Sequence, residues 1–486
     1  MTPHFCPHYP RPQAKRPSLW RMFFSKRRSW LDGLYERSYH MKMGEVHLPG
    51  VDLYMVNEPA LVRRVMVDES AAFPKHEVLG DVLRPLLGDS IFTTNGEVWQ
   101  RQRELMNPSF EAARLKLVFG RMRDAADAMV QRLRRVPEGS EYDVEVEMTH
   151  VAADIILRTI LSEAIDGDAA QRVFAAFERY QALAPQLMMP AFFGLRWLRP
   201  WWQVGRSRRA ADEIRALLVD LIRPRYDAYR GSVAAGGDGT AGGTAGGDDI
   251  LATLLRVRDE RSGEGFSFDE LVNQVAMLFL AGHETSASAL SWSLHMLANA
   301  PEVQQRLHDE AAGGLAAALA DPGELKGLVL ARNVFRETLR LFPPVGFFAR
   351  QASSACTMRD KTVPAGASVL ISPWLIQRHR ALWAAPDAFD PDRYERDESS
   401  AGAATGEAVD GALPSTRESL RKAYLPFGMG PRVCIGAAFA LQEATLILAT
   451  LARHFRFEPV PGHAPEPVGR LTIRAENGIR LKVFAR

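Results

Sequence analysis

The hydrophobic pattern of this chain is mostly helical. Apolar residues recur at the three- and four-residue spacing of amphipathic helices over several long stretches. The clearest of these cover residues 59–67, 112–135, 148–162, 333–341 and 437–451. The longest stretch begins at Ser267, which forms a capping-box sequence with Glu270, and no proline follows before Pro301. It predicts a helix of about 32 residues and about 48 Å, long enough to cross a whole domain.

Strand patterns are few and short. Alternation and β-branched residues indicate a strand over residues 47–56, and residues 471–483 predict a hairpin around Asn477-Gly478. Prolines and glycines interrupt the apolar residues 74–91, which predicts a connecting loop. The expected fold class is therefore mainly α with a small β region.

Two tracts of small and polar residues contain too few apolar side chains to fold by themselves. They predict flexible surface loops near residues 231–249 and 397–416, rather than linkers between domains. The first 31 residues are basic and contain no acid. We therefore expect a basic N-terminal arm, residues 1–40, before a single domain of residues 41–486. Whether the arm targets an organelle or contacts a membrane stays open.

The totals exclude several classes of protein. The formal charge of +2, from 60 basic and 58 acidic residues in 486, gives no field of the kind that nucleic-acid binding uses, so nucleic acid is not an expected partner. No run reaches the roughly 18 apolar residues that a transmembrane segment needs. Three scattered cysteines argue against a disulfide framework. These features together predict a cytoplasmic protein.

One cysteine stands in an unusual context. Residues 427–436 read Phe-Gly-Met-Gly-Pro-Arg-Val-Cys-Ile-Gly, so Cys434 lies in a glycine-rich loop just before the predicted helix 437–451. A helix N-terminus favours a thiolate, and Arg432 can neutralise an anion on the same face. Phe427 can shield the sulfur from water. Such a thiolate suits a haem iron, whereas a lone cysteine in a turn is by default buried and inert.

The positions Phe427, Gly430, Arg432, Cys434 and Gly436 closely resemble the haem-binding loop of the cytochrome P-450 family. The resemblance implies that the Cys434 thiolate is the axial ligand of the iron of haem b, which favours O–O cleavage. It also implies a mostly helical single domain of triangular outline, with the haem between the long distal helix and the helix after the cysteine loop. The reaction implied is monooxygenation with O2 as cosubstrate, similar to that of the soluble bacterial members.

The long predicted helix carries a polar interruption, Ala281-Gly282-His283-Glu284-Thr285. Gly282 costs about 1 kcal/mol relative to Ala, and Glu284 is an acid in otherwise apolar company. We expect the Thr285 hydroxyl to bind the Ala281 carbonyl and open the helix, and the missing side chain of Gly282 to leave room for a diatomic ligand. The motif is similar to that of the family's distal helix, in which the acid and the alcohol supply protons to dioxygen. The alternative is an ordinary kinked core helix, and His283 is expected to be hydrogen-bonded rather than a metal ligand.

Further residues match the family's haem contacts. Trp99 and Arg103, four apart on one helix face, are similar to a pair that contacts one haem propionate. Arg350 corresponds to a position that often pairs with the second propionate, and the resemblance gives Arg432 a propionate as well. Taken alone, the first pair is no more than a core tryptophan beside a surface arginine.

Glu337 and Arg340 lie three apart in a predicted helix and, taken alone, form a surface ion pair. They match the family's Glu-x-x-Arg, and Arg393 in the sequence Pro-Asp-Arg-Tyr matches its later partner. The resemblance implies a buried structural network of these three residues that braces the cysteine loop.

Electrons are expected to come from NAD(P)H through a separate redox partner, a ferredoxin or flavodoxin with its reductase, docking near Arg421, Lys422 and Arg432. By resemblance, residues 74–91 and 177–202 are a pocket wall and a substrate-access region. Their apolar side chains favour a hydrophobic small molecule such as a fatty acid, terpenoid, steroid or aromatic, which undergoes hydroxylation or epoxidation. Two alternatives stay open: a haem-thiolate isomerase, dehydratase or peroxygenase that needs no reductase, and a non-catalytic haem-binding sensor.

Overall fold

The structure is a computed structural model, and the part of the chain that it describes has several gaps. The described residues are 5–10, 12–15, 29–48, 50–165, 167–168, 171–177, 179–181, 201–235, 248–395 and 416–486. Much of the predicted basic arm, of the predicted access region and of the two predicted flexible loops therefore lies outside the described residues. The parts concerned are residues 16–28, 182–200, 236–247 and 396–415.

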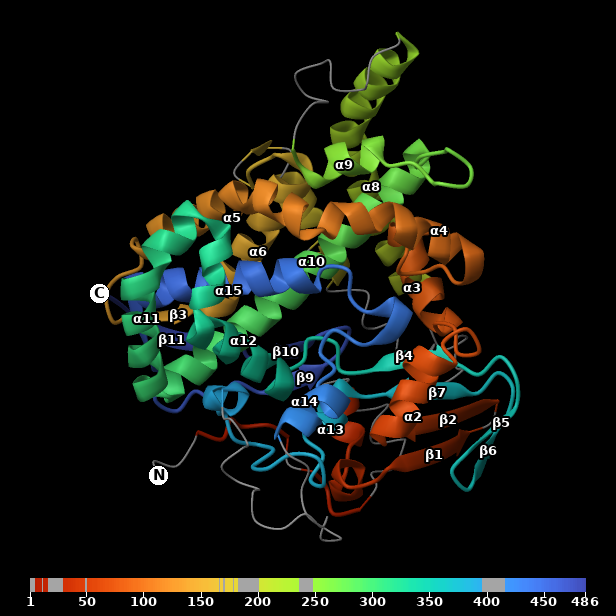
Figure 1. Cartoon of the computed structure of the whole chain (residues 1–486). Coiled ribbons are helices and arrows are strands. Elements are labelled where there is room, and N and C mark those ends of the chain that lie inside the picture. Colours follow the sequence, from red (N-terminus) through yellow and green to blue (C-terminus); the bar gives the residue numbers. More distant parts are fainter. Residues whose placement is uncertain are drawn as a thin grey trace.

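Helices make up most of the described chain and pack around one long central helix, α10, while the larger sheet lies at one side of the helical part (Figure 1). The helices are α2 Pro59–Arg63, α3 Glu77–Leu87, α4 Gly96–Met106, α5 Ala112–Leu133, α6 Val144–Leu161, α8 Trp201–Ala234, α9 Ile250–Arg256, α10 Phe268–Asn299, α11 Pro301–Ala320, α12 Val329–Leu341, α13 Pro373–Ile376, α14 Thr416–Ala423 and α15 Ala437–His454. Shorter helical turns are η1 Trp30–Gly33, η2 Glu36–Tyr39, η3 Arg64–Asp68, η4 Asn107–Phe110, η6 Pro322–Gly327, η7 Pro391–Tyr394 and η9 Gly430–Arg432.

The strands form small sheets. They are β1 Met43–Leu48, β2 Val51–Val56, β3 Glu141–Asp143, β4 Phe348–Gln351, β5 Cys356–Met358, β6 Lys361–Val363, β7 Ser368–Ile371, β8 Phe455–Pro459, β9 Pro467–Gly469, β10 Ile473–Ala475 and β11 Arg480–Ala485. The largest sheet has the order β1-β2-β7-β4, in which only the β2–β7 pair is parallel. A second sheet has the order β3-β11-β8, and β9–β10 and β5–β6 are separate antiparallel pairs. The expected class, mainly α with a small β region, is confirmed.

The predicted long helix is also confirmed. α10 is 32 residues long, and its capping box is reciprocal: the Ser267 hydroxyl accepts the Glu270 N–H at 3.2 Å, and the Glu270 carboxylate accepts the Ser267 N–H at 2.9 Å. Nearly every side chain from Leu271 to Ala298 is buried, so the helix is covered on all sides. α6, α8, α12 and α15 pack against it, which makes α10 the axis of the core.

The apolar residues 74–91, predicted as a loop, instead contain helix α3. Its first turn is capped by His76, whose Nδ1 accepts the Val78 N–H at 3.2 Å, and it ends before Gly88, which has a φ of 49°. Pro85 lies inside the helix, where it removes one backbone hydrogen bond. Burial of one apolar face outweighs these breakers, and that gain depends on tertiary contacts.

Two strand predictions need correction as well. The single strand expected over residues 47–56 is the second half of a hairpin, β1–β2, that begins at Met43. Residues 471–483 do not form one hairpin, because β10 pairs with β9 whereas β11 pairs with β8 and β3. Gly478, with a φ of 72°, still turns the chain between β10 and β11. β3, one partner of β11, is remote in sequence, so local alternation does not identify it.

Candidate active site

The loop before α15 has a conformation that requires glycine. Gly428 and Gly430 have φ values of 72° and 71°, and a Cβ on Gly430 would stand 2.2 Å from the carbonyl oxygen of Met66. The Cys434 N–H donates to the carbonyl of Phe427 at 2.9 Å and closes the loop. The loop backbone therefore lies tightly against the end of η3, and Cys434 is held three residues before the first turn of α15.

Two properties of the Cys434 thiol point in different directions. It is exposed to a molecule of the size of water, yet burial raises the pKa of the thiol, an effect that the Gly436 N–H and the charge of Arg103 oppose. Arg103 also donates to the carbonyl of Val433 at 2.8 Å. Cys434 is therefore accessible to solvent although protein atoms closely surround its sulfur. The N-terminus of α15 and the guanidinium favour its thiolate form.

The middle of α10 has one open face. Ala281, Gly282 and Thr285 are partly exposed, whereas the residues on either side of them along the helix are buried. The Thr285 hydroxyl donates to the carbonyl of Ala281 at 2.7 Å, as the sequence predicts, although α10 runs through this point as an unbroken helix. The open face is small and carries one hydroxyl group.

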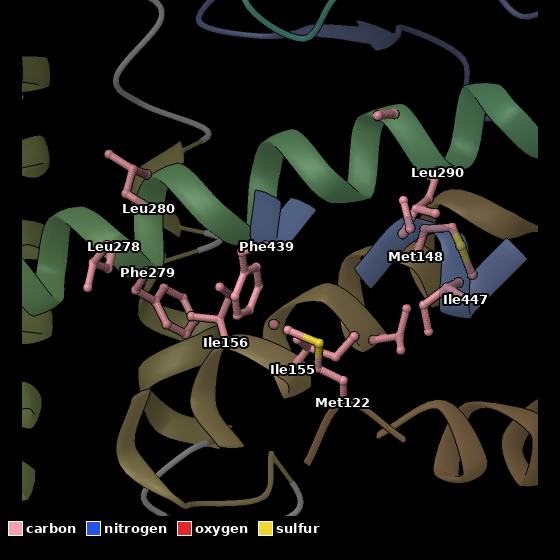
Figure 2. Packing of buried hydrophobic residues seen from close by; sticks show 14 of the residues in the cluster. Met122, Met148, Ile155, Ile156, Leu278, Phe279, Leu280, Leu290, Phe439 and Ile447 are labelled. Carbon is pink, nitrogen blue, oxygen red and sulfur yellow. The ribbon is translucent and has the colours of Figure 1, made fainter. Parts of the chain in front are cut away.

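The missing side chain of Gly282 was expected to leave room for a diatomic ligand, but the structure shows another reason for a glycine here. A Cβ at this position would stand 2.5 Å from Cδ1 of Ile156, so the missing side chain makes room for α6. Figure 2 shows Ile156 among the apolar side chains that α5, α6, α10 and α15 send into the core. Close packing of α6 against α10 therefore fixes this residue.

Glu284 is buried and has a partner for each carboxyl oxygen. Thr472, between β9 and β10, donates to Oε1 at 2.6 Å, and the amide of Gln181 donates to Oε2 at 3.0 Å. Burial raises the pKa of Glu284, while the charge of Arg474 and these hydrogen bonds act in the opposite direction. The carboxyl group is thus predisposed to hold a proton.

His283 is part of the apolar core. Its Nδ1–H donates to the carbonyl of Phe279 at 3.2 Å, and burial lowers the pKa of the imidazole to about 3, so it is neutral. The ring packs against Phe174 and Phe177. This arrangement agrees with the expectation that His283 is hydrogen-bonded.

Four cations lie together beside the cysteine loop. Lys75 Nζ is 5.9 Å and Arg432 Cζ is 5.2 Å from the centre of the Trp99 ring. Burial, followed by the charges of Arg432, Arg350 and Arg103, lowers the pKa of Lys75 to about 6. Burial and Arg432 lower the pKa of Arg350 to about 10. Within the described residues no carboxylate forms an ion pair with any of the four, so the cluster is suited to bind an anion.

Glu337, Arg340 and Arg393 form a buried network. Arg340 donates to both carboxylate oxygens of Glu337, at 2.9 and 3.0 Å, and Arg393 Nε donates to Oε1 at 2.9 Å. Burial alone would raise the pKa of Glu337, but the two arginines lower it below its usual value. The carboxylate is therefore charged, and both arginines depend on it.

Hydrogen bonds connect this network to the cysteine loop. Arg340 Nη1 donates to the carbonyl of Gln377 at 2.9 Å, and the Gln377 side chain accepts the Leu425 N–H at 2.8 Å. Leu425 precedes the loop by two residues. The network therefore supports the cysteine loop through one intermediate side chain.

Sequence reasoning missed four polar residues of this region. Lys75, Gln181 and Thr472 lie in segments without a recognisable motif. Glu443 of α15 is a further buried acid, whose Oε2 accepts the Ser286 hydroxyl at 2.8 Å and whose pKa burial raises to about 8. The sequence could have indicated Glu443, because it is an acid within an apolar predicted helix, as Glu284 is.

The comparison with protein families agrees with this geometry. The family model described as Cytochrome P450 matches residues 10–483. The chain belongs to the cytochrome P450 family. Among curated relatives, cyclooctatin synthase of Streptomyces melanosporofaciens is 31% identical over 90% of this chain and 87% of its own. Pentalenene oxygenase of Streptomyces avermitilis is 30% identical over 92% and 91%. Cyclooctat-9-en-7-ol 5-monooxygenase of Streptomyces melanosporofaciens is 30% identical over 87% and 84%.

A solved structure supports the fold. The heme domain of cytochrome P450DA matches with a TM-score of 0.75, covering 92% of this chain and 90% of that one at 24% sequence identity. The protein is thus an oxidoreductase of the P450 monooxygenase class, whose members use haem and O2. In the described parts of the chain, no helix combines the length and apolarity that crossing a bilayer requires.

The residues present fit the haem of this family. The accessible thiol of Cys434 offers an iron ligand, and the four basic side chains, which form no ion pair with a carboxylate of the described residues, offer partners for two carboxylates. The open face of α10 bears mainly small side chains, which leaves room above a flat ring.

We predict that Glu337→Gln destabilises the protein strongly. The substitution keeps the shape but leaves Arg340 and Arg393 buried without a counter-charge, which should cost about 3–5 kcal/mol in the free energy of unfolding. Chemical denaturation measures this, and haem content after purification should fall with it.

Arg306→Gln is the matched control. Arg306 pairs with Asp392 at 2.7 Å, next to Arg393 in sequence, but their side chains are 51% and 40% exposed. Its loss should cost no more than about 1 kcal/mol. Equal costs for the two variants would show that the buried network does not brace the fold.

Proposed function

We propose that haem b binds between α10 and the loop of residues 427–436, with the Cys434 thiolate as axial ligand of the iron. The observation that carries this proposal is a cysteine that is accessible although protein atoms closely surround its sulfur. Phe427 shields the sulfur from bulk water, and Gly436, whose N–H points toward the sulfur, stabilises the thiolate. Haem, when bound, supplies the redox-active iron at which O2 is reduced.

The cation cluster holds the two propionates in this proposal. Trp99, Arg103, Arg350 and Arg432 are the residues that the family resemblance assigns to them, and we add Lys75 because it lies against the same tryptophan ring. Burial lowers the pKa of Lys75 most, and the neighbouring arginines lower it further; anions in this position offset that repulsion. Haem binding therefore supplies the negative charges that neutralise these basic side chains.

Glu284 and Thr285 manage protons for the reaction RH + O2 + 2 electrons + 2 protons → ROH + water. Glu284 is a buried acid that favours its protonated form, and the Thr285 hydroxyl lies on the open face of α10. Ala281 and Gly282 form the rest of that face and keep it uncrowded. In this proposal the alcohol turns its O–H from the carbonyl of Ala281 toward the oxygen side of the site, and the acid restores its proton.

The electrons come from NAD(P)H through a separate ferredoxin or flavodoxin with its reductase. Arg421 and Lys422 are exposed on α14, just before the cysteine loop, and can contact an acidic partner. Arg432 is less suited to this than expected, because it donates to the carbonyls of Ser70 and Phe73 at 3.1 Å and belongs to the cation cluster. An unchanged reduction rate after reversing both exposed charges would refute this docking surface.

We infer that the substrate is a carbocyclic terpenoid. Three of the most similar relatives are named for cyclooctatin, cyclooctat-9-en-7-ol and pentalenene. Partly exposed Val345, Phe347 and Phe348, between α12 and β4, can contact such a ring system. The proposed reaction is the hydroxylation or epoxidation of such a terpenoid.

We predict that the enzyme oxidises a terpene panel in a reductant-dependent manner. With NADPH, a surrogate ferredoxin and its reductase, pentalenene or cyclooctat-9-en-7-ol should gain one oxygen atom, and lauric acid should react much less. Mass spectrometry of the products measures this. Equal product formation without reductant would indicate a peroxygenase or isomerase instead, and preferential oxidation of lauric acid would contradict the terpenoid assignment.

The same assay tests the proton relay. Thr285→Ala should lower the product formed per NADPH several-fold and release the balance as hydrogen peroxide, because the hydroxyl is lost. Thr285→Ser keeps the hydroxyl and should stay close to wild type. Identical coupling in all three proteins would refute the role of Thr285.

We predict that Lys75 changes the pH dependence of haem binding. In the cofactor-free protein the pKa of Lys75 is about 6, so between about pH 7 and 9 the neutral amine gains a proton when a propionate arrives. The Cys434 thiol, whose pKa is raised, loses a proton on binding iron. The two changes oppose each other, so wild-type affinity should vary little with pH.

In Lys75→Met, the only proton exchanged on haem binding is the one that the Cys434 thiol loses. Haem affinity should then be lower at pH 7 and rise up to about tenfold per pH unit. Titration of haem into the apoprotein measures this, with the surface variant Lys361→Met as control. Parallel pH profiles for Lys75→Met and wild type would show that Lys75 does not face a propionate.

A further inference from the structure

Trp30 of η1 fills a space that two glycines leave open. A Cβ on Gly346 would stand 2.0 Å from Cζ2 of the Trp30 ring, and a Cβ on Gly469 would stand 2.4 Å from its Cε2. At both positions the nearest atoms all belong to this one indole, and neither glycine has the positive φ that would itself require glycine. Carbon atoms pack at about 3.5–4.0 Å, so no larger residue fits beside Trp30.

Both glycines belong to segments that approach the active site. Gly346 lies between α12 and β4, next to Phe347, whose ring meets Trp30 edge-on with 5.5 Å between the centroids. Gly469 ends β9, and its N–H donates to the Ser29 hydroxyl at 2.9 Å. Residues 29 and 30 therefore hold the two segments from the outside.

The turn after Gly469 reaches α10 at two points. Thr472 donates to Glu284 at 2.6 Å, and the Ser288 hydroxyl, one helical turn further along, donates to the carbonyl of Ile473 at 2.6 Å. The Ile473 N–H donates to the carbonyl of Pro344 at 3.0 Å, two residues before Gly346. The indole, the turn and the carboxyl group of Glu284 are thus joined by consecutive contacts.

We propose that Trp30 is a positioning residue that places the β9–β10 turn, and through Thr472 the carboxyl group of Glu284. The indole occupies the space beside both Gly346 and Gly469, so a smaller side chain lets the turn move toward the vacated space and carries the Thr472 hydroxyl with it. The Glu284 carboxyl group then loses the partner of Oε1 and changes its position relative to Thr285. The proposal rests on the proton-managing role of Glu284 given above.

A stability comparison tests the contact of the Trp30 indole with Gly346 and Gly469 without any haem chemistry. Gly469→Ala should lower the unfolding midpoint clearly in the wild-type background and have little effect in Trp30→Ala, where the space is open. Gly313→Ala, a helical glycine with nothing within 4 Å of its Cβ position, should behave alike in both backgrounds. An equal effect of Gly469→Ala in the two backgrounds would overturn the contact on which the proposal depends.

Coupling of the reaction tests the positioning role. With the terpene that gives most product in the panel, Trp30→Phe and Thr472→Val should each lower the product per NADPH several-fold. The missing product should appear as hydrogen peroxide by O2 + NADPH + H+ → H2O2 + NADP+. If Trp30 acts through Thr472, the double variant should couple no worse than Thr472→Val alone, and Thr472→Ser should restore coupling.

The outcomes separate the two levels of the account. Multiplied losses in the double variant, or wild-type coupling in Trp30→Phe, would overturn the positioning role. Leu315→Ala, a buried residue of α11 remote from the turn, controls for destabilisation and should keep its coupling. Wild-type enzyme without any product would refute the proposed function instead, and the stability comparison would still decide whether Trp30 sets the turn.

Discussion

Unpaired positive charge beside the cysteine loop is the constraint on which this structure depends. Lys75, Arg103, Arg350 and Arg432 come from four separate parts of the chain. Burial lowers the pKa of all four, and the charges of neighbouring arginines lower those of Lys75 and Arg350 further. A fold that gathers such groups stores an unfavourable energy that a bound anion removes. Haem with two propionates meets this need beside an open thiol, so cofactor binding and folding are linked.

The second group of buried cations shows the contrast. Arg340 and Arg393 share the carboxylate of Glu337 and need no ligand, so they can serve as a fixed support for the loop. One region of the protein is thus neutralised by its own side chains, and the proposed function has a cofactor neutralise the other.

On the other side of the site, the polar groups of α10 are held from outside the helix. Glu284 faces Thr472 and Gln181, while Thr285 turns its hydroxyl to its own helix. Because Thr472 follows the strand that Trp30 supports, the position of an acid in the core depends on a residue near the N-terminus. Such dependence is expected where packing is dense, since small shifts propagate through contacts.

Local patterns predicted much of this architecture, and remote contacts account for the rest. The capping box of Ser267 and the glycine loop around Cys434 depend on neighbours in sequence, and the structure forms both as expected. α3 was predicted as a loop because Pro85 signals a break, whereas burial of its apolar face decides the outcome. The residues 471–483 were misread because β11 pairs with strands far away in sequence.

The sites follow the same division. Family motifs identified Glu337, Arg340 and Arg393, which the structure brings together in one network. Lys75 and Thr472 carry no motif, since their chemistry arises only when segments meet; Thr472 is 188 residues from Glu284. The wedge of Trp30 between two glycines is likewise a property of the folded chain.

The central claim is that the Cys434 thiolate ligates a haem iron. The most direct test is the difference spectrum of the reduced, carbon-monoxide-bound protein, because the position of the Soret band reports the axial ligand. We predict the strongly red-shifted band of thiolate ligation for the wild type and its loss in Cys434→Ala. A band typical of histidine ligation in the wild type, or a red-shifted band that survives in Cys434→Ala, would contradict the assignment.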